Sequence, residues 1–134
     1  MERHSAVTFK TDGKSITLAY INNSYGYLHA IFNYEDLHVL RNNKLYGYPK
    51  ILILGSLFIN ERFRGQGIGS LLLSTLIKYA CENAVIKIIL DDMSDNCRQK
   101  HNIYIKNGFR YVHDYGPEME LTLIPDFDFE LSKI

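Results

Sequence analysis

A glycine-rich segment after a run of apolar residues carries the clearest chemical signal in the sequence. Residues 59–73 read INERFRGQGIGSLLL, so Arg64 and three glycines precede a leucine-rich stretch. Glycine lets the backbone approach a ligand closely. The first turn of a helix offers unpaired N–H groups at the positive end of its dipole. Together these features predict a phosphate-binding loop at the start of a helix.

Two common nucleotide-binding patterns do not fit this segment. The Walker A pattern ends in Gly-Lys-Ser/Thr, and no lysine follows these glycines. Gly13-Lys14-Ser15 has that ending, but Thr8 stands where the first glycine of the pattern is required. The Rossmann pattern requires a third glycine where Ser70 stands. With these two patterns excluded, the segment is described by an Arg-x-x-Gly-x-Gly pattern, Arg64 to Gly69, that follows a predicted strand.

This pattern resembles motif A of the GNAT N-acetyltransferase superfamily, which binds the pyrophosphate of acetyl-CoA. A second segment, residues 102–109 (NIYIKNGF), is similar to the family's second signature, a helix that ends in Tyr-x-Lys-x-Gly-Phe. A predicted helix, strand and helix fill the interval, as they do in the family. The resemblance extends over residues 51–109.

The resemblance implies an enzyme that moves an acetyl group from acetyl-CoA directly to a primary amine. The acceptor is open between a small amine such as a polyamine and a lysine or N-terminus of a protein. Tyr104 matches the tyrosine that protonates the departing CoA thiolate. The residues that the resemblance places at CoA are Leu57, Phe58, Ile59, Arg64, Gly65, Gln66, Gly67, Ile68, Gly69, Ser70, Asn96 and Lys106. No metal is expected.

The sequence departs from the family pattern at two positions. Some relatives carry a catalytic glutamate early in the fourth strand, but the matching stretch Lys50–Ile53 has no carboxylate. The asparagine that usually begins the second helix falls at Asn96, one position off the common register. A general base must therefore come from elsewhere or act through water, and the candidates are His29, Glu35, His38, Asp91 and Asp92.

Several of these residues also have a purely structural interpretation. Tyr104 fits a packing tyrosine, and His29 fits a structural histidine on a strand. The acidic run at residues 91–95 lacks the glycine that a calcium-binding loop needs, so we expect it to cap a helix or to attract a cationic amine. Cys97 has no evident histidine partner, so we do not expect it to act as a nucleophile.

Strands are predicted wherever apolar residues alternate or run continuously. Alternating or β-branched segments predict strands, and continuous apolar runs predict strands buried on both faces. A final antiparallel pair is predicted around Gly116-Pro117. The predicted strands are residues 6–10, 15–21, 25–34, 51–59, 85–90, 109–115 and 119–124.

Two helices are predicted in the second half of the chain. Leucines at helical spacing predict one helix at residues 68–82. A second helix is predicted at residues 95–106, with the acidic run as its N-cap and Asn107-Gly108 as its C-terminal end. Residues 35–50 are predicted to form a long connection, with room for one helical turn.

This order of elements predicts an α/β (α+β) fold in a single domain over residues 1–134. We expect a mixed, mainly antiparallel sheet flanked by helices, as in the GNAT fold. The family usually has one or two helices near its N-terminus, which wall the acceptor site. The first sixty residues here predict almost wholly strands and turns, so this helical region is expected to be reduced, that is, absent or replaced by the stretch at residues 35–50.

Composition and charge narrow the class of protein further. Fifteen basic and fifteen acidic residues give a formal net charge of zero, which argues against direct nucleic-acid binding. Cys81 and Cys97 fit free thiols in a reducing compartment. No signal-peptide pattern begins the sequence, and its longest apolar run falls short of the ~20 residues of a membrane-spanning helix. We therefore expect a cytoplasmic protein without a membrane segment.

Two other functions stay open from the sequence. A non-catalytic acyl-CoA-binding sensor or assembly module would keep the phosphate loop without turnover. A nucleotide-binding regulatory domain is disfavoured because the Walker and Rossmann patterns fail. Edge strands and the alternating segment at residues 126–131 also make a homodimer an expectation to test.

Overall fold

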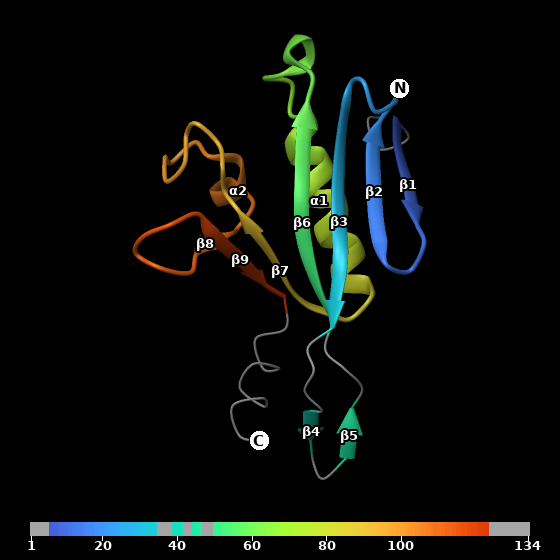
Figure 1. Cartoon of the computed structure of the whole chain (residues 1–134). Helices are drawn as coiled ribbons and strands as arrows, with labels where there is room; N and C mark the ends of the chain where they lie inside the picture. The colour runs from blue at the N-terminus through green and yellow to red at the C-terminus, as the bar shows by residue number, and fades with distance from the viewer. Residues whose placement is uncertain (1–5, 35–38, 42–43, 47–49, 124–134) are drawn as a thin grey trace.

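A seven-stranded mixed sheet is the frame of the computed structural model, which describes residues 6–34, 39–41, 44–46 and 50–123 (Figure 1). The strand order is β1-β2-β3-β6-β7-β9-β8, and every neighbouring pair is antiparallel except β6 and β7. The strands are β1 Val7–Thr11, β2 Ser15–Tyr20, β3 Gly26–Tyr34, β6 Lys50–Ile59, β7 Val85–Asp91, β8 Arg110–Tyr111 and β9 Glu118–Thr122. The strands β4 Val39–Arg41 and β5 Lys44–Tyr46 pair in a separate antiparallel sheet.

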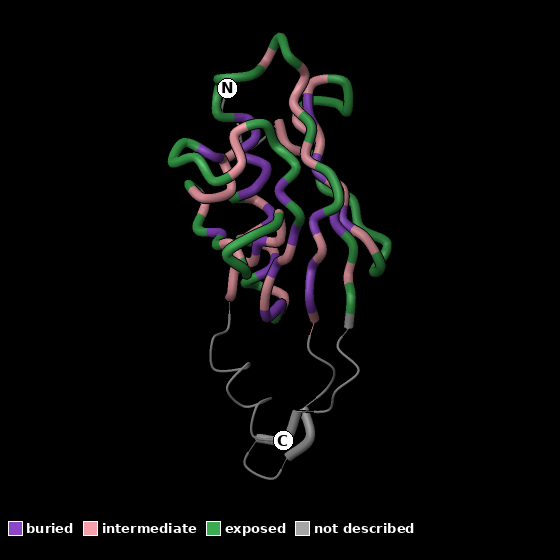
Figure 2. Tube along the Cα trace, turned by 60° about the vertical axis from the view of Figure 1, so that its left-hand side comes forward, coloured by how far each residue is buried: buried purple, intermediate pink, exposed green. Residues whose placement is uncertain are grey.

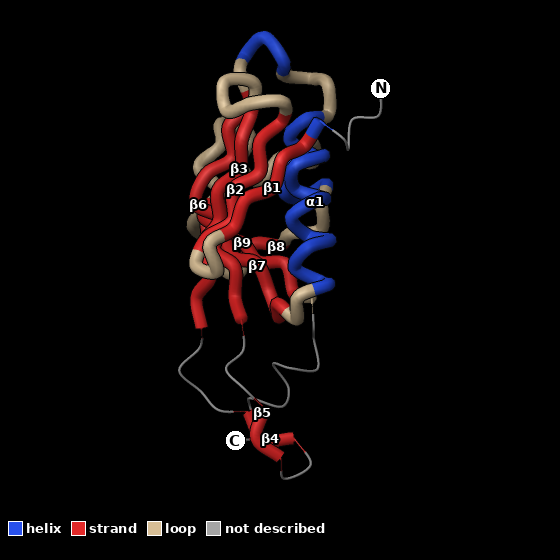
Figure 3. Tube along the Cα trace, turned by 90° about the vertical axis from the view of Figure 1, so that its right-hand side faces the viewer, coloured by secondary structure: helices blue, strands red, loops and turns tan. Residues whose placement is uncertain are grey.

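Helix α1, Ile68–Glu82, connects the parallel strands β6 and β7 and lies along one face of the sheet (Figures 1 and 3). Its leucines recur at helical spacing, so that Leu72, Leu73 and Leu76 are fully buried on one side. They join a core of apolar side chains from β2, β3, β6 and β7. Figure 2 shows these buried positions running through the middle of the molecule.

The opposite face of β1, β2, β3 and β6 carries no helix within the described residues. The short helix α2, Ile103–Lys106, lies on the α1 side, because a Cβ at Gly69 of α1 would be 2.7 Å from the Ile103 side chain. On β3, Ala30 is buried in the core, whereas Ile31 points to the other face and is 45% exposed. The predicted fold class is confirmed, and the described residues before 60 contain no α-helix, in keeping with the reduced N-terminal helical region that the sequence predicts.

Most of the predicted elements are found close to their predicted bounds. The predicted helix at residues 68–82 is α1, and five of the predicted strands match β1, β2, β3, β6 and β7 within one residue at each end. Asn107 ends α2, and Gly108 follows with φ 95°, as predicted. The last antiparallel pair is present, although β8 is only two residues long. Part of the predicted connection at 35–50 is the β4–β5 pair, and its last residue, Lys50, begins β6. The rest of it, and the segment 126–131, lie outside the described residues.

The second predicted helix, at residues 95–106, is wrong over most of its length. Residues 95–101 form turns, and only Ile103–Lys106 is helical. Arg98 has φ 66°, a left-handed conformation that a right-handed helix does not tolerate. The Asp92 carboxylate accepts the Ser94 N–H instead of capping a helix, and Asn102 is the N-cap of α2.

The packing of α1 predicts how two substitutions on this helix affect stability. Leu76→Ala should lower the free energy of unfolding by about 2–5 kcal/mol, because truncating a fully buried side chain leaves a cavity. Lys78→Ala, at an exposed position of the same helix, should change it by less than about 0.5 kcal/mol. Urea unfolding followed by circular dichroism measures both. Equal losses in the two variants would contradict the packing described here.

Candidate active site

The strands β6 and β7 separate partway along their length, and a cleft lies beside their separated ends. Their parallel pairing ends at Ile53 and Ile89, after which the ladders described for β6 and β7 run to β3 and β9 respectively. The ladder between β3 and β6 shifts at Gly55, which is an extra residue opposite His29 and Ala30. Such a bulge bends a strand and increases its twist. The cleft has a volume of about 870 Å³.

The edge of β6 that faces the cleft offers backbone hydrogen-bonding groups. The Asn60 N–H donates to the Tyr25 carbonyl on the β3 side. Because backbone directions alternate along a strand, the N–H and C=O groups of Leu57 and Ile59 point to the cleft side. Consistent with this, the Ile59 carbonyl accepts a hydrogen bond of 3.0 Å from the Arg64 Nε. An extended ligand could pair with this edge as a strand does.

The glycine-rich loop at residues 64–70 forms a second wall of the cleft. Gly65 and Gly67 have φ values of 79° and 80°, the left-handed conformation that glycine adopts without strain. Helix α1 begins directly after Gly67, with no side chain capping its first turn. The first N–H groups of a helix have no partner within it and carry the positive end of its dipole. This wall is therefore suited to an anion.

The loop is anchored to the turn between β2 and β3. The Asn60 Nδ2 donates to the Ser24 carbonyl at 3.1 Å, and the Asn60 Oδ1 accepts from the Arg62 N–H in the short 3-10 helix η2, Glu61–Phe63. The Tyr25 ring stacks on the Phe63 ring at 4.3 Å with an interplanar angle of 15°. These contacts hold the loop in place without using the N–H groups of α1.

Tyr104 lines the cleft from α2, which packs against the first turn of α1. Its ring packs edge-on against Phe109, with centroids 6.0 Å apart. Burial, and after it the negative charge of Asp92, raise the pKa of the Tyr104 hydroxyl above its ordinary value of 10.0. The hydroxyl is thus protonated at neutral pH, which suits a proton donor. Among the described residues, none accepts a hydrogen bond from this hydroxyl.

Asp92 is buried behind this wall and is fully engaged, so it is not placed to act as a general base. Its carboxylate accepts hydrogen bonds from Ser94, Asn102 and Tyr111. Burial opposes ionisation, but these hydrogen bonds outweigh it and hold the pKa of Asp92 below its ordinary value of 3.8.

The other predicted base candidates within the described residues, His29 and Asp91, do not line the cleft either. His29 is half-buried on β3 and Asp91 is exposed at the end of β7. Glu35 and His38 lie outside the described residues. Within the described part of the chain, no three His, Cys, Asp or Glu side chains are grouped to hold a metal ion. In that same part, no helix is long and apolar enough to cross a membrane.

The structure brings nearly all of the predicted site residues to this one cleft. Gln66 is the exception: it is exposed and does not line the cleft, because it stands between two left-handed glycines. The predicted residues that line it are Leu57, Phe58, Ile59, Arg64, Gly65, Gly67, Ile68, Gly69, Ser70, Asn96, Tyr104 and Lys106.

Five lining residues were not predicted from the sequence: Phe63, Ser94, Asp95, His101 and Ile103. Ser94 and Asp95 belong to the acidic run, which the sequence assigned to capping or to a cation. Ile103 had a signal, because it begins the second motif's helix, one position before Tyr104. His101 and Phe63 carry no motif, and only the folded loops bring them to the cleft.

A mixed sheet that opens beside a glycine-rich helix start defines the class of acetyltransferases with the N-acetyltransferase fold. The family model of the acetyltransferase (GNAT) domain matches residues 12–111, which is well over half of the chain, and the chain belongs to this family. No curated protein sequence matches the chain significantly.

Solved structures show the same fold at low sequence identity. A GNAT-family acetyltransferase from Staphylococcus aureus Mu50 has 22% identity and a TM-score of 0.57, with 84% of this chain and 70% of that chain covered. The PaiA N-acetyltransferase from Thermoplasma acidophilum, in complex with coenzyme A, has 19% identity and a TM-score of 0.56, with 81% and 61% covered. A KacTA–DNA complex has 12% identity and a TM-score of 0.60, with 92% and 77% covered.

The hydrogen bonds around Asp92 predict a pH dependence of stability. A lowered pKa in the folded state contributes stability that is complete above about pH 4 and is lost as the pH falls towards the folded pKa. Asp92→Asn should therefore lower the free energy of unfolding at pH 7 by about 1–3 kcal/mol, and the deficit should shrink below pH 4. Urea unfolding between pH 3 and 7 measures it.

Asp114→Asn is the control for this prediction. Asp114 is an exposed acid in the loop before β9, and its substitution should leave the unfolding free energy nearly unchanged at every pH. A deficit for Asp92→Asn that stays constant down to pH 3 would contradict the assignment of a lowered pKa to Asp92.

Proposed function

We propose that this protein transfers an acetyl group from acetyl-CoA to a primary amine. The observation that carries the proposal is the convergence of three features on one cleft: a loop suited to an anion, a strand edge that presents backbone groups to the cleft, and a protonated tyrosine. Family membership supports acetyl transfer in general. The coenzyme A bound to the PaiA N-acetyltransferase supports CoA as the substrate of the cleft.

The cleft residues divide naturally among the parts of acetyl-CoA. The N–H groups around residues 65–70 would bind the pyrophosphate, and the cationic side chains of Arg64 and Lys106 add positive charge on the same cleft. The pantetheine arm carries amides, so it would pair with the backbone groups of Leu57 and Ile59. A backbone N–H on this edge would also stabilise the oxyanion that forms from the thioester carbonyl. Asn96 would contact the arm from the opposite side.

The reaction then needs no covalent enzyme intermediate. The neutral acceptor amine attacks the thioester carbonyl carbon, and the tetrahedral intermediate collapses as the carbon–sulfur bond breaks. The CoA thiolate takes the proton of the Tyr104 hydroxyl, and the amine nitrogen gives up its surplus proton to water or a base. Solvent restores the proton to Tyr104. None of the described base candidates that the sequence predicted lines the cleft, but Asp95 and His101 do, and either could accept the proton of the amine directly or through water.

The acceptor side is proposed to be open. Within the described residues no helix covers the sheet face that includes Ile31 and Phe58, which are 45% and 38% exposed. This face would admit a small amine or a protein lysine or N-terminus. The solved KacTA complex contains DNA, but we do not propose DNA binding for this chain, because its basic and acidic residues are equal in number. A cytoplasmic setting fits the two free cysteines.

A non-catalytic acyl-CoA-binding module is the second function to consider. The observation in its favour is that no described carboxylate or histidine from the predicted base candidates reaches the cleft. Such a module would bind CoA without turnover.

A thiol-release assay separates these functions. Purified protein is incubated with acetyl-CoA and, in separate reactions, with polyamines, amino acids, aminoglycosides and basic peptides. Calorimetry measures CoA binding in parallel. Thiol release with one acceptor class supports the enzyme and names its substrate class. Tight CoA binding without turnover for any acceptor would favour the module. Absence of CoA binding would contradict both.

Gly67→Glu should abolish CoA binding by placing a bulky negative group where the pyrophosphate is proposed to lie. Gly13→Glu is a matched control, because Gly13 has nearly the same backbone strain, with φ 84° against 80°, but lies in an exposed turn far from the cleft residues. Calorimetry should show at least a ~100-fold weaker Kd for Gly67→Glu, since about 3 kcal/mol is lost, and an unchanged Kd for Gly13→Glu. Equal weakening in both variants would place CoA elsewhere.

Tyr104→Phe should lower kcat by about 10²-fold, within the range of general acid catalysis, with little change in KM for acetyl-CoA. Because the pKa of Tyr104 lies above 10.0, the hydroxyl stays protonated from pH 7 to 9, so the ratio of wild-type to variant kcat should be constant over that range. Steady-state thiol release at three pH values measures it. A kcat that is unaffected by the substitution would remove Tyr104 from the chemistry.

A further inference from the structure

The loop between β7 and α2 is organised around one buried carboxylate. Asp92 is 2% exposed, and its Oδ1 accepts the Ser94 N–H at 3.1 Å and the Ser94 hydroxyl. Its Oδ2 accepts the Asn102 Nδ2 at 2.9 Å and the Tyr111 hydroxyl. A buried charge is tolerated only when its oxygens are satisfied in this way. The four donors come from the loop, from α2 and from β8, so the carboxylate joins three segments.

Asn102 connects this carboxylate to the turn that bears Tyr104. The Asn102 side chain is fully buried, and while its Nδ2 donates to Asp92, its Oδ1 accepts the N–H groups of Tyr104 at 2.8 Å and Ile105 at 3.2 Å. The two ends of the Asn102 amide therefore link the Asp92 carboxylate to the backbone of the first turn of α2. Helix α2 has only four residues, and such a short helix is not stable by itself. This cap holds its first turn, while Ile103 packs on Gly69 and the Asn107 Nδ2 donates to the Ser70 hydroxyl at 3.5 Å at its other end.

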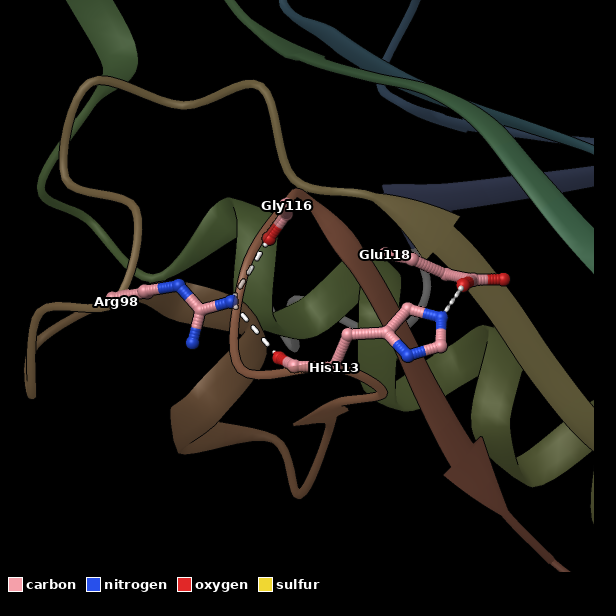
Figure 4. A network of polar contacts seen from close by, with 4 residues as sticks. All are labelled: Arg98, His113, Gly116 and Glu118. Carbon is pink, nitrogen blue, oxygen red and sulfur yellow. Dashed lines mark hydrogen bonds and ion pairs between the residues drawn. The ribbon is translucent and has the colours of Figure 1, made fainter.

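Tyr111, on β8, also donates a hydrogen bond to the Asp92 carboxylate. Its hydroxyl accepts the Arg98 N–H at 2.7 Å while donating to Asp92. The Arg98 guanidinium lies 4.1 Å from the centre of the Tyr111 ring and donates to the carbonyls of His113 and Gly116 at 3.1 and 3.0 Å (Figure 4). These bonds hold the irregular loop that replaces the predicted helix.

We propose that Asp92 is a positioning residue for acetyl transfer, which fixes the α2 turn through Asn102 so that Tyr104 faces the cleft. The inference rests on the proposed function of Tyr104. Asp92 itself does not line the cleft, so it acts through its partners and not on the substrate. Burial, and after it the charge of Asp92, raise the pKa of Tyr104, but a tyrosine at its ordinary value of 10.0 is already protonated at neutral pH, so the proposed role of Asp92 rests on position and not on this charge.

A double-mutant cycle tests this coupling. Asp92→Asn keeps the size of the side chain but presents an amide N–H where Asn102 and Tyr111 offer their own hydrogens. With the best acceptor of the thiol-release panel, kcat should fall at least tenfold, and KM for acetyl-CoA should stay within about threefold. In a Tyr104→Phe background the same substitution should lower kcat by less than about twofold, because the donor it positions is gone.

A rescue variant separates positioning from loss of structure. Asp92→Asn with Asn102→Asp reverses the hydrogen bond between the two side chains and keeps a good N-cap at residue 102. We expect it to recover at least half of the lost kcat and to slow the amide hydrogen exchange of Tyr104 and Ile105, which Asp92→Asn alone should speed. Asp114→Asn, at an exposed loop position, should leave kcat unchanged.

Each outcome decides for or against the positioning role. Loss of kcat by the same factor in both backgrounds, or no loss in the wild-type background, would overturn it. If Tyr104→Phe itself keeps full kcat, acetyl transfer stands and the positioning role is overturned. If the wild-type protein neither binds CoA nor releases thiol, the proposed function fails, and the positioning role fails with it.

Discussion

The separation of β6 from β7 after Ile53 is the constraint on which the rest of the site depends. Two parallel strands that stay paired would satisfy one another and leave no backbone groups for a ligand. The extra residue Gly55 shifts the ladder with β3 just after the last β6–β7 pair, and such a bulge bends a strand. The backbone of Leu57 and Ile59 is thereby presented to the cleft, while β3 still holds β6 from the other side. The core beneath α1 keeps both strands in place.

The two walls of the cleft are built by different means. The wall at the start of α1 uses backbone conformation, because left-handed glycines turn the chain and leave the first helical N–H groups uncapped. The wall at α2 uses side-chain hydrogen bonds, because four helical residues cannot hold their own position. The hydrogen bonds of the buried Asp92 carboxylate help to hold this short helix in place. The first wall is therefore suited to binding an anion, and the second to holding one hydroxyl in place.

The first wall could be predicted from the sequence and the second only in part. Periodic leucines after Gly67 specify α1 locally, so its bounds matched the prediction. Residues 95–101 also have a composition that permits a helix, but the fold gives the Asp92 carboxylate to Ser94, Asn102 and Tyr111. The Tyr111 hydroxyl donates to Asp92 from 19 residues along the chain, and a contact at that separation cannot be predicted from a local sequence pattern. Tyr104 was found because it belongs to a motif, whereas His101 was missed because only the turns bring it to the cleft.

In the proposed function, acetyl-CoA occupies the cleft beside the separated ends of β6 and β7. An acetyl-CoA titration of ¹⁵N-labelled protein, followed by amide chemical shifts, tests it most directly. If acetyl-CoA binds there, saturable shifts should be largest at the amides of residues 57–59 and 65–70, with the exposed turn at Gly13 unaffected. Saturable shifts confined to other parts of the sheet, or no saturable shift at all, would contradict it.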